Sequence, residues 1–588
     1  MKNTLQTLAE TSGFTQTGRT DEVAALCEQF VQTWPDAVRR VQYGTSVEGR
    51  PMLALIASRT GALDPKELRA RKVPVLMIQA GIHPGESDGK DAGFIALREL
   101  LEGSAAKGVL DRIAVLFVPA FNVDGHERFG RWNRPNQVGP EETGWRATAQ
   151  NLNLNRDYMK AEAPEMVAML KLISQWDPLV TADLHVTDGA NFEPDVSNQA
   201  EPVNQGDPQL RASGVQIRDE LNAKLAAQGS MPLPFYPDLA RTDDPSSGFI
   251  LTVYSPRFST GYFPQRNRFT VLVETHSWKP YAARVRVTRN TIVGLAEIVA
   301  ARGPALLEQV RKSDADAAML GGTELTLDYA SGWREPTKAG GGAGALSDDG
   351  ARMIEFRGYA YSRTMSPISG GLVTIYDPKT PQVWHVPLRD KVKPSLVVTA
   401  PRGGYVVSQS FAREVAAKLD AHGISYRVLD KTHAAAHAPL RLESFRATQV
   451  QFSSTPFEGR MRATLGGSWK EEQRAISAGA LFVPIAQPLA RLVLALFEPQ
   501  APDSFAAWGF FNACFEDKEH TEPYVAEQIA RDMLAADADL RLEFERRLKT
   551  DTEFSTNPAA RLEFFLRRHA SWDERLNLYP VFRVEKPE

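Results

Sequence analysis

The chain has 588 residues, 43% of them hydrophobic, so it is long enough to bury one large core and to form two or three domains. Its 68 basic and 72 acidic residues give a net charge of −4, and no basic stripe alternates with aromatic residues. This balance argues against nucleic acid as the main partner and favours a small substrate or a peptide.

The two cysteines, Cys27 and Cys514, lie far apart, so we expect no disulfide framework, and a metal would need His, Asp or Glu ligands. The first residues lack a basic start followed by an apolar core, and no apolar run approaches the ~18 residues of a membrane span. We expect a soluble protein, cytoplasmic if the chain is full length and periplasmic or secreted if a signal peptide has been removed. The oligomeric state stays unknown.

Short apolar runs alternate with helical patterns over the first half of the chain, which is typical of an α/β layer structure. Apolar runs bounded by turn residues indicate buried strands, and apolar residues at helical spacing indicate helices. The expected strands cover residues 73–80, 112–120, 178–186 and 269–277, and the expected helices cover residues 90–103 and 163–176.

Each of the four expected strands ends in a polar cluster. The clusters read, in chain order, GIHPGE, FNVDGHE, DLHVTD and VETHS. Ligands of open α/β sheets bind at the carboxyl ends of the strands. We therefore expect one site to be shared by all four clusters.

The second half differs in composition. Residues 338–350 are rich in glycine and predict a linker, after which the sequence predicts a β-rich element, an α/β unit and a charged helical region. We expect a first domain over residues 1–325, a β-rich element with its linker over residues 326–395, and an α/β and helical accessory region over residues 396–588.

Two motifs of the second half carry no expected chemistry. Residues 400–411 have paired glycines after a strand but lack a phosphate-binding signature, so we interpret them as a plain loop. His433 and His437 lie four residues apart, but no glutamate follows the first histidine, so we interpret them as part of a solvated helix face.

The first polar cluster contains a candidate metal-binding pair. Catalytic zinc takes three protein ligands from His, Glu and Asp and keeps a fourth position for water. His83 and Glu86 lie three residues apart after an expected strand, a pattern that alone is more often a solvated turn. His185 ends another expected strand and is the candidate third ligand, whereas we do not assign His126 and His276 to the metal.

Six motifs now stand in order: G-x-H-x-x-E, N-x-D-G, W-N-R, L-N-R-D, D-L-H and V-E-T. Over roughly residues 42–297 the chain resembles the zinc carboxypeptidase family (peptidase family M14, the metallocarboxypeptidases) in residue types and order. The resemblance implies a zinc-carboxypeptidase-like mixed sheet flanked by helices in the first domain. It also implies one zinc ion per chain, with His83, Glu86 and His185 as its ligands.

The resemblance implies roles for further residues. Glu274 matches the catalytic glutamate, and Asn155 with Arg156 matches the pair that receives the substrate's terminal carboxylate. Asp183 points to the same side of its strand as His185, so it either orients that ligand or bonds neighbouring backbone.

Two further assignments leave competitors open. Arg134 best matches the arginine that polarises the scissile carbonyl, with Arg131 as its competitor, because the family usually places this arginine directly after a tryptophan and here a residue intervenes. For the mobile tyrosine that contacts the substrate, Tyr262 is preferred over Tyr254.

The expected function is a zinc-dependent hydrolase that cleaves a C-terminal amide or peptide bond with metal-activated water and a glutamate general base. The expected partner is a peptide or peptide-like small molecule with a free carboxylate. A zinc-dependent deacylase or murein-peptide amidase is one alternative. A non-catalytic peptide-binding protein is another, disfavoured because the expected ligands and glutamate are present.

Overall fold

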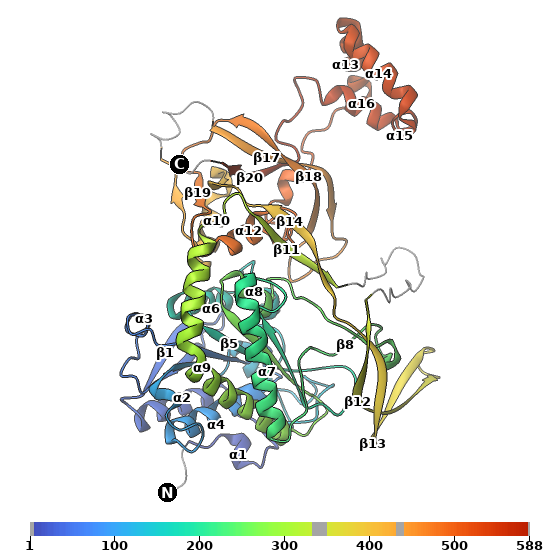
Figure 1. Ribbon diagram of the computed structural model, residues 1–588. Coiled ribbons are helices and arrows are strands. Elements are labelled where there is room, and N and C mark those ends of the chain that lie inside the picture. The colour runs from blue at the N-terminus through green and yellow to red at the C-terminus, as the bar shows by residue number, and fades with distance from the viewer. Residues whose placement is uncertain (1–4, 332–349, 431–439, 586–588) are drawn as a thin grey trace.

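The computed structural model describes residues 5–331, 350–430 and 440–585 (Figure 1). His433, His437 and nearly all of the expected glycine-rich linker therefore lie outside the described residues. No helix in the described part of the chain is long and apolar enough to cross a membrane.

The first half is built around an eight-stranded mixed sheet in the order β1-β2-β4-β3-β5-β10-β6-β7. Its strands are β1 (Val38–Thr45), β2 (Pro51–Ala57), β3 (Val75–Ala80), β4 (Ala114–Val118), β5 (Val180–Val186), β6 (Val196–Glu201), β7 (Pro232–Leu233) and β10 (Phe269–Thr275). The inner strands β4, β3, β5 and β10 run parallel, so their carboxyl ends meet at one edge. The expected α/β fold with a mixed sheet is confirmed.

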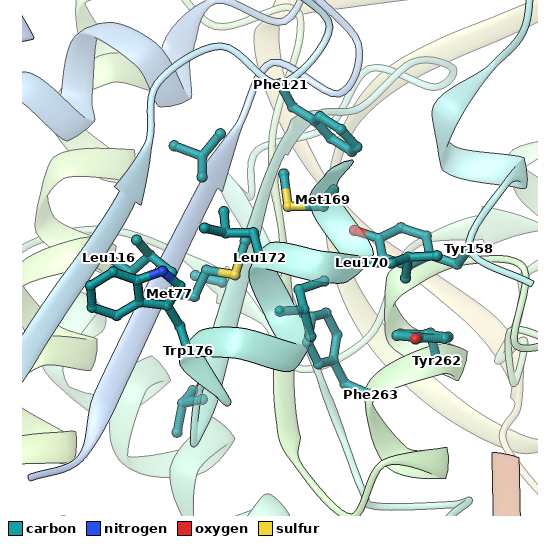
Figure 2. Packing of buried hydrophobic residues seen from close by; sticks show 14 of the residues in the cluster. Met77, Leu116, Phe121, Tyr158, Met169, Leu170, Leu172, Trp176, Tyr262 and Phe263 are labelled. Atoms are coloured by element: carbon teal, nitrogen blue, oxygen red, sulfur yellow. The ribbon is translucent and has the colours of Figure 1, made fainter. Parts of the chain in front are cut away.

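Helices cover both faces of this sheet, which explains why every residue of β3, β4 and β5 is buried. Helix α6 (Pro164–Trp176) places Leu172 and Trp176 beside Met77 and Leu116 (Figure 2). Side chains alternate between the faces of a strand, so the next residue, Phe117, points to the other face. There it meets α4 (Asp88–Glu102) at Gly93, where an added Cβ would lie 2.3 Å from the Phe117 ring.

Other helices of the first half are α1 (Leu8–Thr11), α2 (Thr20–Thr33), α3 (Pro65–Ala70), α5 (Val123–Glu127), α7 (Arg211–Ala227), α8 (Ser259–Gln265) and the long α9 (Tyr281–Ala317). Figure 1 shows α9 running from the first half toward the sheets of the second.

A four-stranded sheet joins the two halves of the chain. Short strands β8 (Asp238–Leu239) and β9 (Phe249–Ile250) pair with each other, and β9 pairs with β13 (Leu372–Arg389), which in turn pairs with β12 (Arg352–Met365). The sheet therefore takes strands from both sides of residue 325. The division at residues 325 and 395 stays a prediction.

The remaining strands form a pair and a six-stranded sheet. The pair is β11 (Glu324–Ser331) with β14 (Val392–Thr399). The larger sheet runs β16 (Arg427–Val428), β19 (Leu481–Pro484), β15 (Gly404–Val407), β20 (Leu578–Val584), β17 (Leu440–Phe452) and β18 (Ala463–Arg474), and it packs with α10 (Gln409–His422) and α12 (Ala490–Phe497).

The charged helical region forms a separate lobe. It contains α13 (Pro523–Ala536), α14 (Ala538–Thr550), α15 (Thr552–Thr556) and α16 (Pro558–Leu566), which share a small core of their own. Figure 1 shows this lobe, in red, projecting from the six-stranded sheet and away from the first half.

A buried ion pair ties the edge of the large sheet to its helices. The Arg284 guanidinium in α9 donates to the Asp88 carboxylate at the start of α4, with Nε 2.9 Å from Oδ2. The hydroxyl of Thr275, the last residue of β10, donates to the same carboxylate at 2.7 Å. Arg284 also donates to the carbonyls of Val138 and Gly139, so this pair holds α4, α9 and β10 in place behind the strand ends.

Replacing Arg284 with Met should destabilise the fold by about 3–5 kcal/mol, because Asp88 would be left as an uncompensated buried charge. The free energy of unfolding in denaturant measures this loss. Adding Asp88→Asn to Arg284→Met should recover part of it. A loss below about 1 kcal/mol in the single variant would show that the pair does not stabilise the fold.

Candidate metal centre

Three of the four polar clusters meet at the carboxyl edge of the inner strands. Gly81 follows β3 with a φ of 69°, a left-handed conformation that favours glycine, and turns the chain so that His83 and Glu86 lie over the edge. His185 lies in β5, and Glu274 stands opposite it in the neighbouring strand β10. The imidazoles of His83 and His185 and the Glu86 carboxylate are all buried.

The three expected ligands face one another. Nδ1 of His83 lies 3.1 Å from Oε1 of Glu86, and Nδ1 of His185 lies 3.0 Å from Oε2 of the same carboxylate. Their ligand atoms all lie within 4.8 Å of one another. The structure thus brings together residues that are about a hundred positions apart in the sequence.

The far side of each imidazole meets an oxygen acceptor. Nε2 of His83 lies 3.1 Å from Oδ1 of Asn153, and Nε2 of His185 lies 3.0 Å from Oδ2 of Asp183. Asp183 is fixed in turn by the Gln79 amide, which donates to it at 2.8 Å. At His83 the acceptor at Nε2 favours a proton there and leaves the Nδ1 lone pair facing Glu86, whereas at His185 it is Nδ1 that is hydrogen-bonded to Glu86.

This arrangement fits a divalent cation. Nδ1 of His83 is buried and makes no hydrogen bond within the described part of the chain, although a carboxylate lies 3.1 Å away. Two imidazole nitrogens and one carboxylate form one of the donor sets that hold catalytic zinc. A cation between these donors removes the repulsion between the lone pairs and the carboxylate.

The charges around the cluster are strongly coupled. Burial alone would raise the pKa of Glu86, but His83 and Arg134 hold it well below its usual value. Burial alone would lower the pKa of His185, but Asp183 and Glu86 raise it well above its usual value. The carboxylates of Asp183 and Glu86 therefore favour positive charge at the position of His185.

Beside this cluster lies a cavity of about 230 Å³ that opens to solvent. It is lined by His83, Glu86, Arg146, Asn155, Arg156, His185, Val186, Asp188, Tyr236, Tyr254, Phe258, Ser259, Thr260, Leu272 and Glu274. Burial raises the pKa of Glu274 to about 8. The cavity therefore joins the metal cluster to a carboxyl group suited to proton transfer.

Asn155 and Arg156 lie in the cavity wall as expected, on the short 3₁₀ helix η2 (Leu154–Arg156). The Arg156 guanidinium lies 4.2 Å above the Phe258 ring. Burial, with the nearby charges of Arg146 and Arg257, lowers the pKa of Arg156 to about 10.

Arg134 does not line the cavity, because its guanidinium is engaged elsewhere. Its Nη1 lies 3.0 Å from Glu86, and its Nη2 donates to the carbonyls of Val186 and Thr187 at 3.0 and 3.2 Å. Arg134 thus lies against Glu86 and outside the residues that line the cavity, and its expected role in polarising a scissile carbonyl stays a prediction. Its competitor Arg131 is also out of place, with an exposed side chain packed on Trp132.

Arg146, which is not among the predicted site residues, lines the cavity together with Arg156. Its side chain is 40% exposed, with Nη1 3.4 Å from Glu86. The sequence does contain a signal for this residue, because Arg146 directly follows Trp145, which is the order expected of the family. The remaining polar cluster, FNVDGHE, supports this loop. The Trp145 N–H donates to the Gly125 carbonyl at 2.7 Å, and the Asn122 amide donates to the Arg146 carbonyl.

Tyr262 is also displaced from its expected position. It is fully buried in α8, its hydroxyl lies 3.0 Å from Nδ1 of His422, and its ring packs beside Tyr158 in the core (Figure 2). Tyr254 lines the cavity instead. Of the two tyrosines, Tyr254 is therefore the one placed to reach a ligand in the cavity, and its role stays a prediction.

His126 and His276 lie outside the metal cluster. The His276 ring stacks on Phe192 with centroids 4.0 Å apart, and His126 packs against Phe129. Burial lowers the pKa of both imidazoles to about 3, so both are neutral at physiological pH.

Comparison with known proteins agrees with this geometry. Residues 23–221 match the family described as zinc carboxypeptidase. This segment belongs to that family. Carboxypeptidase 2 of Trichophyton tonsurans is 22% identical over 476 residues, which cover 79% of this chain and 78% of that protein. Carboxypeptidase 2 of Trichophyton equinum is 23% identical over 476 residues, which also cover 79% of this chain and 78% of that protein.

Solved structures of carboxypeptidases are also similar to the chain. A metallo-carboxypeptidase from Burkholderia cenocepacia has 18% identity and a TM-score of 0.35, with 50% of this chain and 69% of that chain covered. Carboxypeptidase A from Helicoverpa armigera has 16% identity and a TM-score of 0.36, with 49% of this chain and 73% of that chain covered. The chain is a zinc metallopeptidase of the carboxypeptidase type, and its substrates are peptides.

Removing zinc should lower the thermal unfolding midpoint, because a metal that binds only the folded state stabilises it by about 2.7 kcal/mol at a hundred times its dissociation constant. We expect dialysis against a chelator to lower the midpoint by about 3 °C or more and zinc to restore it. Scanning calorimetry with metal analysis measures both. His185→Asn should abolish the shift; a full shift in this variant would place the zinc elsewhere.

Proposed function

We propose that this metallopeptidase releases the residue at the free carboxyl end of a peptide, and that Arg156 with Asn155 binds the terminal carboxylate. The observation that carries the proposal is the electrostatics of Arg156. Among residues 5–331, 350–430 and 440–585, no carboxylate lies within 4.0 Å of its guanidinium, although the side chain is mostly buried.

Two neighbouring arginines are already engaged. Arg146 contacts Glu86, and Arg257 donates to Asp503 at 3.1 Å. Within the described part of the chain, the Arg156 guanidinium donates only to the Asn155 carbonyl, at 2.7 Å. A buried cation is stable when an anion neutralises it, and a planar guanidinium can hold a carboxylate through two parallel hydrogen bonds.

Asn155 supports the same assignment. It lines the cavity beside Arg156. A side-chain amide offers both a donor and an acceptor, so a ligand carboxylate can accept from its nitrogen. The two neighbours on η2 thus present donors to one anion.

The bond cleaved lies between this carboxylate site and the metal cluster. His83, Glu86 and His185 would hold the zinc, which when bound would supply a water activated for attack at neutral pH. Glu274 takes the proton of the attacking water and delivers it to the leaving amine. A carboxyl group with a pKa near 8 can do both, because it exchanges a proton readily near neutral pH.

Two further groups face the reacting carbonyl. Arg146 lines the cavity next to Glu86 and can stabilise the negative charge that develops on the carbonyl oxygen. Burial raises the pKa of Tyr254, so its hydroxyl keeps its proton and can donate a hydrogen bond to the substrate.

Replacing Glu274 with Gln should lower kcat by roughly 10²- to 10⁴-fold, because the amide cannot take up the water proton. Zinc content and the thermal midpoint should stay at wild-type values, since Glu274 is not one of the three ligands. Steady-state kinetics with metal analysis makes the measurement. A Gln variant with near-normal kcat would remove Glu274 from the mechanism.

Replacing Arg156 with Ala should raise KM at least about 10-fold for a peptide with a free terminal carboxylate, because a charge-assisted bidentate contact is lost. The matched control is the same peptide with an amidated terminus, on which wild type and variant should differ little. Equal losses on both substrates would contradict the carboxylate-binding role.

Product analysis on N-acyl amino acids and murein peptides tests the deacylase and amidase alternatives.

A further inference from the structure

The second half of the chain reaches the catalytic cleft through the loop that joins β17 to β18. We call residues 453–462 the hairpin tip. One carboxylate oxygen of Glu458, on this tip, accepts the backbone N–H of Asn153 at 2.8 Å. These two residues are 305 positions apart in the sequence, so only the packing of the second half brings them together.

Asn153 connects the metal cluster to the carboxylate site. Its side-chain oxygen lies 3.1 Å from Nε2 of His83 and accepts the N–H of Asn155 at 3.0 Å. Its carbonyl accepts the N–H of Arg156 at 3.0 Å. Its own N–H points out of this network, and Glu458 is the group that fixes it.

The hairpin tip is itself held firmly. Arg460 donates to Glu162 through Nε at 2.8 Å, and its guanidinium lies 3.7 Å from the centroid of the Phe510 ring. Phe457 stacks on Trp508 with centroids 5.9 Å apart and an interplanar angle of 14°. The tip can therefore act as a rigid support and not as a loose loop.

The second half also contacts the segment that carries Phe258. The backbone N–H and the Nη1 of Arg257 both donate to Asp503, at 2.9 and 3.1 Å. The Arg257 guanidinium lies 5.8 Å from the centroid of the Phe457 ring on the hairpin tip. Arg257 adjoins Phe258, the ring that packs against Arg156, so the second half contacts the carboxylate site at a second point.

We propose that Glu458 is a positioning residue of the peptidase site, and that the second half of the chain thereby completes the active centre. Acting through Asn153, it fixes the orientation of the His83 imidazole and the turn that presents Asn155 and Arg156. Its negative charge also offsets the charges of Arg146 and Arg257 around Arg156. The carboxylate-binding part rests on the proposed function, whereas the part that concerns His83 rests on the metal cluster alone.

The test compares three variants of the full-length chain. Glu458→Met keeps the length of the side chain and removes the acceptor. Glu458→Gln keeps an oxygen acceptor and removes the charge. Thr455→Ala, at an exposed position on the same tip, is the matched control.

Glu458→Met should release zinc to a chromogenic chelator about 3- to 10-fold faster, a smaller effect than the roughly 10- to 100-fold loss of affinity on mutation of a direct partner of a ligand. KM for a peptide with a free carboxylate should rise about 5- to 10-fold, with kcat within about 3-fold of wild type. Glu458→Gln should recover most of the zinc retention, and Thr455→Ala should match wild type in both measurements.

Wild-type zinc release and KM in Glu458→Met would overturn the proposal. Faster zinc release in a chain that cleaves no carboxyl-terminal residue would refute the proposed function and leave the positioning role intact. If Glu458→Met does not fold, the proposal is tested by hydrogen exchange of the folded wild-type chain, read out in the segment of residues 151–157. Protection of the Asn153 amide supports the proposal, and exchange at the rate of an unstructured peptide overturns it.

Discussion

A carboxylate as deeply buried as that of Glu86 is stable only where positive charge or hydrogen-bond donors surround it. Here the imidazoles of His83 and His185 and the guanidinium groups of Arg134 and Arg146 all lie within 3.4 Å of its oxygens. These groups come from the loop after β3, from β5 and from the segment before η2. The site therefore exists only while the inner strands keep their register.

The same need to balance buried charge applies across the cavity, which has two regions of opposite charge. Glu86 and Glu274 make one side suited to a metal cation and to proton transfer, while Arg156 makes the other side suited to an anion. A peptide that places its carboxylate at Arg156 presents its last amide bond to the metal side. The hairpin tip braces the junction of these two regions at Asn153, so the second half serves the chemistry of the first.

Local patterns in the sequence were enough to predict the inner strands, the helices beside them and the cluster of His83, Glu86 and His185, because each depends on a short apolar run and the polar residues after it. The sequence does not single out Arg146, because two segments, Trp132-Asn133-Arg134 and Trp145-Arg146, both place an arginine close after a tryptophan, and only the fold shows which arginine lines the cavity. Tyr262 was preferred over Tyr254 because spacing alone does not reveal that α8 turns it into the core. The contact of Glu458 with Asn153 could not be predicted, since it depends on how distant segments pack.

The most direct test of the account is an anomalous-scattering map from crystals of the zinc-loaded enzyme, recorded above and below the zinc absorption edge. The account predicts one strong peak per chain, bounded by Nδ1 of His83, the Glu86 carboxylate and Nδ1 of His185. A map with no peak at this position, or with its strongest peak bound to other residues, would contradict it.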